Sequence, residues 1–200
     1  MRYGLFYHYQ LLGDVLLIDL LPELPNHQEV RGRVHVLYAG DKIVGYNIFA
    51  ISEIVKIKAK GLIVLPSKPL IDVINSLLVA EHLQALPLIE DSGFCVGKIL
   101  SVEPHPQSEH LHITTVDVGN EILTIVCGAA NCQSGLVVPV ARPGAIMFDG
   151  TRIIPTELLG VASSGMLCSS RELAISDQAG LLVLDRDLKL GSDFFLLGGN

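Results

Sequence analysis

Three histidines lie close together in the second half of the sequence. His105, His110 and His112 fall within eight residues, which invites a metal-binding interpretation. Zinc sites normally combine four Cys or His ligands at compact spacings. The sequence contains neither a CxxC pair nor an HxxxH pair near these histidines. We therefore expect no metal site.

Cys127 and Cys168 are the candidates for a nucleophile, which a neighbouring histidine would have to activate. No base, oxyanion loop or cofactor motif accompanies either thiol. The phosphate-binding patterns GxxxxGK[ST] and GxGxxG are also absent from the sequence. We predict a protein without catalytic residues and without a cofactor, in which the four cysteines are small buried hydrophobic residues.

The composition limits the remaining classes. The 200 residues include 14 Lys and Arg against 21 Asp and Glu, a formal charge of −7. Half of the residues are hydrophobic and the mean hydropathy is +0.48, which excludes intrinsic disorder. Apolar runs such as 15–21 are too short to cross a bilayer, and the first residues lack the features of a signal peptide. These observations predict a cytoplasmic protein with no membrane contact, and the acidity argues against nucleic acid as a partner.

A change of composition divides the chain near residue 93. The segment Pro87–Gly93 has the Pro, acidic and Gly residues of a linker. Residues 1–93 hold 8 basic and 10 acidic residues, a net charge of −2, whereas residues 94–200 hold 6 and 11, a net charge of −5. We predict two domains, 1–92 and 93–200.

The first domain has the pattern of an α+β fold. Strands are predicted where apolar residues alternate or run together, and a helix begins near Lys68, where the period changes to that of one helical face. Ser67 is its predicted N-cap and Pro69 lies in its first turn. The predicted strands are 14–20, 29–38, 42–48, 55–60 and 62–65.

The second domain is a series of short strands separated by Gly or Pro. Gly119-Asn120 is a tight-turn signal that makes its two flanking strands a hairpin. Five or more strands in about 80 residues favour a small barrel, and the five-stranded Greek-key OB-fold is the candidate. The predicted strands are 96–102, 113–118, 122–127, 137–140, 152–154, 158–162, 166–168 and 181–184, with one helical turn at 170–173.

Several motifs of the second domain carry a family resemblance. They are Val96-Gly97-Lys98-Ile99, His105-Pro106, Ile125-Val126-Cys127-Gly128-Ala129-Ala130-Asn131, Val140-Ala141-Arg142-Pro143-Gly144, and Gly160-Val161-Ala162-Ser163-Ser164-Gly165-Met166-Leu167-Cys168-Ser169 followed by Glu172-Leu173. Together they resemble the tRNA-binding OB domain of the phenylalanyl-tRNA synthetase β chain, of methionyl-tRNA synthetase and of stand-alone tRNA-binding proteins. The runs 13–17 and 44–49 resemble the N-terminal extension of YtpR-type stand-alone proteins.

This resemblance implies a non-enzymatic tRNA-binding protein that recognises structured RNA by shape and backbone. Neutral donors such as Asn131 and the serines suit phosphate oxygens and ribose hydroxyls. Two residues have a structural alternative, because Met166 can fill the core and Glu172 can cap backbone N–H groups. His105 precedes Pro in the family motif, which favours a structural role in a turn. The predicted RNA contacts are Lys98, His110, Asn131, Arg142, Arg152, Ser163, Met166, Ser169 and Arg171.

Two departures from the family pattern remove positive charge from the expected RNA face. His110 stands where the family commonly has Lys, and Leu159 stands where it commonly has Arg. The domain also has four Phe and no Tyr or Trp, which leaves few platforms for base stacking. Weakened RNA affinity is therefore expected, and an alternative stays open: an OB module that has lost RNA binding and serves protein interaction or homodimerisation. The stripe Lys56, Lys58 and Lys60 either extends an RNA surface or is the solvated face of an edge strand.

Overall fold

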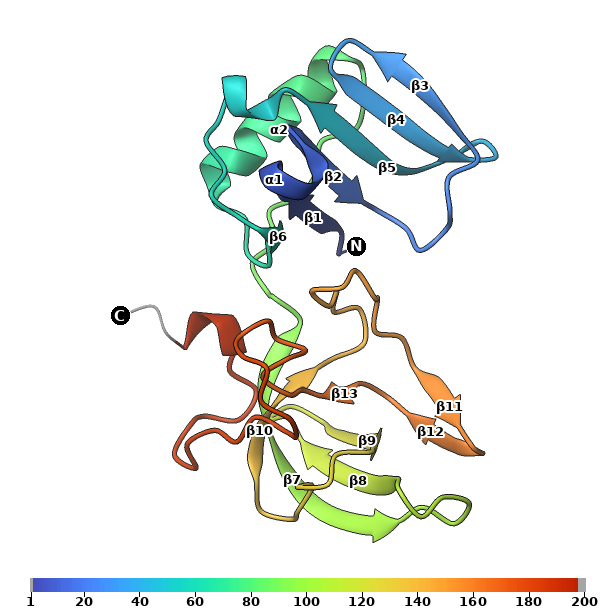
Figure 1. Ribbon diagram of the computed structural model, residues 1–200, viewed down its shortest axis with the longest axis vertical. Helices are drawn as coiled ribbons and strands as arrows, with labels where there is room; N and C mark the ends of the chain where they lie inside the picture. Colours follow the sequence, from blue (N-terminus) through green and yellow to red (C-terminus); the bar gives the residue numbers. More distant parts are fainter. Residues whose placement is uncertain (1, 198–200) are drawn as a thin grey trace. The chain divides into compact units, whose positions relative to one another are not determined.

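The computed structural model describes residues 2–197 and divides into two compact units, 1–90 and 91–200 (Figure 1). No helix within residues 2–197 is long and apolar enough to cross a membrane.

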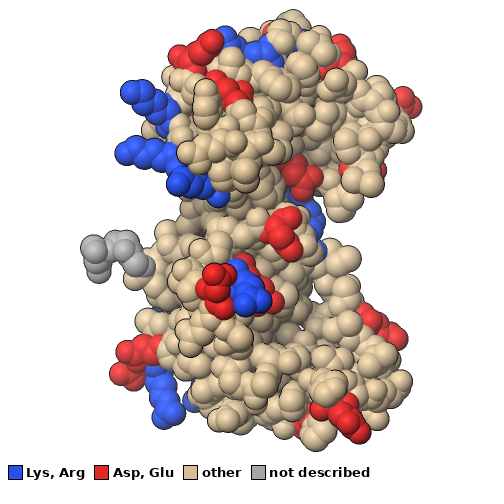
Figure 2. All heavy atoms as spheres, in the orientation of Figure 1, with Lys and Arg blue, Asp and Glu red and all other residues tan. Residues whose placement is uncertain are grey.

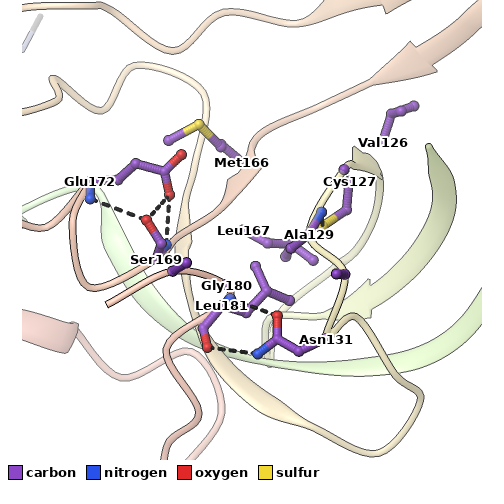
Figure 3. A pocket seen from close by; sticks show the side chains of 13 residues that line it. Val126, Cys127, Ala129, Asn131, Met166, Leu167, Ser169, Glu172, Gly180 and Leu181 are labelled. Carbon is purple, nitrogen blue, oxygen red and sulfur yellow. Dashed lines mark hydrogen bonds between the residues drawn. The ribbon is translucent and has the colours of Figure 1, made fainter. Parts of the chain in front are cut away.

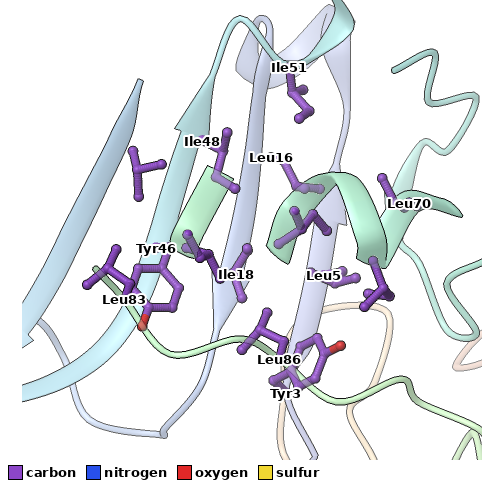
Figure 4. Packing of buried hydrophobic residues seen from close by; sticks show 14 of the residues in the cluster. Tyr3, Leu5, Leu16, Ile18, Tyr46, Ile48, Ile51, Leu70, Leu83 and Leu86 are labelled. Atoms are coloured by element: carbon purple, nitrogen blue, oxygen red, sulfur yellow. The ribbon is translucent and has the colours of Figure 1, made fainter. Parts of the chain in front are cut away.

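The first unit is built on a six-stranded antiparallel sheet. Its strand order is β3-β4-β5-β2-β1-β6. Helix α2 (Lys68–Ala80) packs its apolar face on this sheet, and the shared core is shown in Figure 4. The remaining elements are β1 (Gly4–Tyr7), α1 (Tyr9–Leu12), β2 (Val15–Asp19), β3 (His27–Arg31), β4 (Val34–Ala39), β5 (Lys42–Phe49), the 3-10 turn η1 (Ile51–Glu53) and β6 (Gly61–Leu62).

The helix and the sheet of the first unit follow from the sequence pattern, with local corrections. Helix α2 begins where predicted, although the Ser67 side chain makes no capping hydrogen bond. The predicted single strand 29–38 is wrong, because Gly32 turns with φ +58° and splits it into β3 and β4. The predicted strand 55–60 is also wrong, because only Gly61–Leu62 pairs with β1. Strand β1 and helix α1 were not predicted.

The second unit is a five-stranded, nearly closed barrel, as predicted. Its sheet order is β13-β10-β7-β8-β9. The gap between the ends is bridged at β12, where Ser164 N–H donates to Thr124 O over 2.8 Å. The strands are β7 (Phe94–Pro104), β8 (His112–Asp117), β9 (Ile122–Cys127), β10 (Val137–Ala141), β11 (Thr156–Leu158), β12 (Val161–Ser163) and β13 (Met166–Leu167), followed by the 3-10 turn η2 (Phe194–Leu196).

The barrel interior is closely packed. A Cβ added at Gly97 would lie 2.5 Å from a methyl of Val140, so only glycine fits at this point of β7. The neighbouring core side chains, among them Ile99, Val116 and Ile125, are fully buried. No room is left inside for a ligand at this level of the barrel, and binding must use its outer surface.

Three predicted strands of the second unit need correction. The run 158–162 is the hairpin β11–β12, because Leu159 and Gly160 both adopt positive φ and turn the chain. Residues 152–154 contribute one bridge, between Arg152 and Ile146. The run 181–184 bonds to its neighbours at single positions, such as Leu182 N–H to Cys168 O, and forms no ladder.

Candidate nucleic-acid interface

Two long loops of the barrel are fastened to each other. Residues 105–111 connect β7 to β8, and residues 142–165 connect β10 to β13 and contain the β11–β12 hairpin. His105 is only 4% exposed, and its Nδ1 accepts a hydrogen bond from Gln107 N–H. Its Nε2 therefore carries the proton and donates to Leu158 O over 3.1 Å. The histidine thus holds the first loop against the hairpin, which is the structural role favoured above.

A groove of about 680 Å³ opens beside the end of β9 (Figure 3). It is formed by three stretches of chain: the end of β9 and the loop after it, β13 with the turn that follows, and the segment near residue 180. Its lining residues are Val126, Cys127, Gly128, Ala129, Ala130, Asn131, Met166, Leu167, Ser169, Glu172, Ala179, Gly180 and Leu181. The lining contains one carboxylate and no Lys or Arg.

That carboxylate is occupied within the chain. Glu172 accepts hydrogen bonds from Ser169 N–H (2.6 Å) and from Ser169 Oγ–H (2.7 Å), and its own N–H donates to Ser169 Oγ over 3.2 Å. This reciprocal pattern is a capping box, which fixes the single turn after β13. The structural alternative for Glu172 is therefore confirmed.

Asn131 has a similarly structural set of contacts. Its Oδ1 accepts from Leu181 N–H over 2.8 Å, and its Nδ2 donates to Leu181 O over 3.1 Å (Figure 3). A Cβ at Gly180 would lie only 2.7 Å from Asn131 Oδ1, so the glycine allows the close approach. The amide thereby holds the segment near residue 180 against the loop after β9, and together they form one wall of the groove.

The groove brings together three of the nine predicted contact residues: Asn131, Met166 and Ser169. Ser163 lies nearby but is buried, and its Oγ accepts from Val126 N–H across the β9–β12 gap over 3.1 Å. Met166 is half-buried. It lines the groove and also packs against a cluster of buried side chains that includes Phe94 and Cys168. It therefore belongs to both the core and the surface.

The predicted cations do not gather in the groove. Lys98 is exposed on β7, directly opposite Asp117, at the end of the strands away from Val126. Arg142 donates to Asp91 over 2.7 Å and is neutralised there. Arg171 is exposed on the capped turn, where its side chain donates to Asp177 O.

The other two predicted contacts lie on the fastened loops. His110 is exposed in the first loop, and Arg152 is half-buried in the second. Within the described residues, no group of three or more His, Cys, Asp or Glu side chains could hold a metal ion, so the three histidines do not converge.

The thiols are buried, as the sequence suggested. Cys95, Cys127, Cys132 and Cys168 are free and inaccessible. Burial raises the pKa of Cys168 to about 12 and that of Cys95 to about 11. Burial also raises the pKa of Cys132 to about 12, with the adjacent Cys127 adding to the effect. None of these three is activated as a nucleophile.

The sequence alone does not identify the segment 179–181 as part of the site. Its signal was only the Gly180-Leu181 pair in the tail, because the partner that draws it to the groove is 50 residues away. Gly128, which belongs to the motif Ile125–Asn131, also lines the groove.

A nearly closed five-stranded barrel with two framing loops and an outer groove defines an OB-fold domain, a class that commonly binds nucleic acid on one strand face. The family model described as "Putative tRNA binding domain" matches residues 94–193. A second model, a domain of unknown function (DUF4479), matches residues 25–86.

Two curated proteins and one solved structure are similar to this chain over different lengths. The "Putative tRNA-binding protein YtpR" of Bacillus subtilis is 36% identical over 198 residues, covering 94% of this chain and 98% of its own length. The chain belongs to the YtpR family. The phenylalanine–tRNA ligase beta subunit of Methylococcus capsulatus is 48% identical over 104 residues, or 51% of this chain but only 13% of the ligase subunit. A methionyl-tRNA synthetase related protein from Pyrococcus horikoshii covers 50% of this chain and 85% of its own, at 22% identity and a TM-score of 0.38.

Proposed function

We propose that the chain is a non-enzymatic, cytoplasmic tRNA-binding protein whose barrel recognises folded RNA by shape. The relative that matches nearly the whole chain carries a tRNA-binding name, and the ligase relatives match over the barrel half alone. The alternative of a barrel that serves only protein interaction is not favoured by these matches.

The observation that carries the proposal is the groove at the end of β9, whose lining is uncharged except for Glu172. Its lining consists mostly of apolar side chains and backbone, and its polar side chains, Asn131, Ser169 and Glu172, are hydrogen-bonded within the chain. Such a surface suits ribose hydroxyls and base faces better than it suits a row of phosphates. The outward side chains of β9, from Ile122 through Thr124 to Val126, lead along the strand toward this groove.

The nine predicted contact residues fall into three groups in this proposal. Asn131 and Ser169 build the walls through contacts within the chain, and Ser163 holds the backbone of Val126, which lines the groove. Met166 presents an apolar surface to the RNA, while His110 and Arg171 are exposed beside the loops and the groove. Lys98, Arg142 and Arg152 lie outside the groove lining, so they would not contact RNA bound there.

The test is a titration of bulk tRNA, followed by anisotropy over a salt series that starts at about 50 mM. We expect saturable binding at micromolar protein and a shallow dependence on salt. A variant with His110→Lys and Leu159→Arg restores the two missing charges. Each added phosphate contact should steepen the slope of log affinity against log salt by about 0.7 to 0.9.

The matched control places the same two charges on the first unit, as Gln84→Lys and Leu24→Arg, both at exposed positions. The proposal requires the first variant to bind more tightly than the control. It is overturned if the parent shows no saturable binding at low salt, or if both variants gain equally.

A further inference from the structure

Three exposed lysines lie in the first unit and are therefore not part of the barrel groove. Lys56, Lys58 and Lys60 are exposed, whereas Val55 and Ile57 between them pack against the core. The segment runs between η1 and β6 without forming a strand. The lysines therefore do not shield a sheet edge. The alternation with anchored apolar residues holds them on the solvent side.

The positive charge of these lysines is not neutralised by neighbours. None of the three forms an ion pair with any residue in the range 2–197, whereas Lys42 pairs with Glu23 and Lys68 pairs with Asp72. Figure 2 shows Lys and Arg side chains projecting from the edge of the first unit where this segment runs in Figure 1, with no Asp or Glu between them. This is a local positive field on a chain whose net charge is −7.

A groove of about 410 Å³ lies along the same lysines, and its other wall is aromatic. Tyr9, on α1, is 60% exposed. The Nδ1 of His8 is buried and has no hydrogen-bond partner among the described residues. Gln10 and Ser52 also line the groove.

We propose that this groove binds single-stranded RNA, as a second nucleic-acid surface separate from the barrel. Exposed lysines alternate with half-buried residues from 55 to 60, so the three ammonium groups face solvent in sequence and can follow a phosphate backbone. The exposed Tyr9 ring supplies the stacking platform that the barrel lacks. A positively charged groove combined with an aromatic ring is how proteins hold single strands without reading sequence.

An acidic peptide would use the lysines but would leave the Tyr9 ring without a role. The base of a nucleotide uses both, because every base has a face that stacks. Gln10 and Ser52 add neutral hydrogen-bonding groups to the groove for the sugar or the base edge.

The experiment measures binding of a labelled, unstructured oligouridylate to the full chain by anisotropy over a salt series. In the variant Lys56→Gln/Lys58→Gln/Lys60→Gln, the slope of log affinity against log salt should fall by about 2, from three contacts of about 0.7 each. Tyr9→Ala should weaken binding by about fivefold or more and leave the slope unchanged. The control Lys42→Gln/Lys68→Gln/Arg186→Gln removes the same charge at exposed sites and should leave the slope as in the parent.

Three results would overturn the proposal: no oligouridylate binding by the parent at low salt, an equal fall of slope in the control, or no effect of Tyr9→Ala. The proposal is also refuted if the lysine variant loses a bound acidic protein but still binds RNA. The groove would then be assigned to a protein partner. The oligouridylate has no folded shape, so its binding is measured apart from the tRNA titration of the barrel. A negative result for one proposed RNA-binding surface therefore leaves the test of the other unaffected.

Discussion

Asn131 is the residue at which a structural role and an RNA-binding role can be separated. Replacing it by Ala removes two hydrogen bonds to the backbone of Leu181, of 2.8 and 3.1 Å. Leu181 is only 6% exposed and the two hydrogen bonds are half-buried, so water replaces the lost partners of its N–H and C=O only in part. Each such loss costs about 1–1.5 kcal/mol, which gives about 2–3 kcal/mol in total.

Two measurements check this magnitude. The barrel unit of about 110 residues has an unfolding entropy near 0.23 kcal/mol/K, so its melting temperature should fall by roughly 10 °C in Asn131→Ala. The amide of Leu181 donates directly to Asn131 Oδ1, and its hydrogen exchange should accelerate by about 30- to 150-fold. Gln133→Ala, at an exposed position two residues away, is the control and should change neither quantity.

The refuting result is specific. If Asn131→Ala keeps the parent's melting temperature and Leu181 exchange but loses tRNA binding, the residue contacts RNA and the structural assignment is wrong. If stability falls as calculated, the loss of the groove wall also weakens tRNA binding. Binding should then be recovered at lower temperature, where the segment remains docked.

The other predictions concern neighbouring features of the barrel. His105→Ala leaves Gln107 N–H and Leu158 O without partners and should cost about 1–3 kcal/mol in urea unfolding; a cost below about 0.5 kcal/mol would contradict its role in fastening the loops. Ser169→Ala breaks the capping box and should cost about 1 kcal/mol, with Ser164→Ala as a control that keeps the cap. Cys95, Cys132 and Cys168, whose pKa values burial raises to about 11 or 12, should react with a thiol reagent at neutral pH only after unfolding. Fast reaction of the native protein would show that the site opens.

The elements that the sequence predicted well are those with local signals. Helix α2 shows its period directly, and the hairpin at Gly119-Asn120 shows its turn residues. The errors fall where a turn is made by a residue whose type does not indicate a turn. Leu159, for example, has a φ of +47° although it is not glycine. The residue pair Gly32-Arg33 likewise splits a run that alternates continuously as sequence.

The site was predicted by residue type, and the structure reassigns several of those types. Asn131, Ser163 and Ser169 do have polar groups that could bind RNA. Each of them instead forms hydrogen bonds with the backbone or side chains of this chain. Sequence cannot distinguish these uses, because the partner of Asn131 is 50 residues away and the partner of Ser163 is 37 residues away. The recognisable motifs therefore describe how the groove is built rather than which atoms touch the ligand.

The net charge of −7 is a weak guide to binding because charges act locally. Fields from exposed groups are screened within about 8–10 Å at ordinary ionic strength, so distant carboxylates have little effect on a surface that has none of its own. The barrel groove contains no Lys or Arg and one carboxylate held by Ser169. The groove of the first unit contains three lysines without ion-pair partners among residues 2–197. If both surfaces bind RNA as proposed, folded tRNA on the barrel should depend little on salt, and a single strand on the first unit should depend on it strongly.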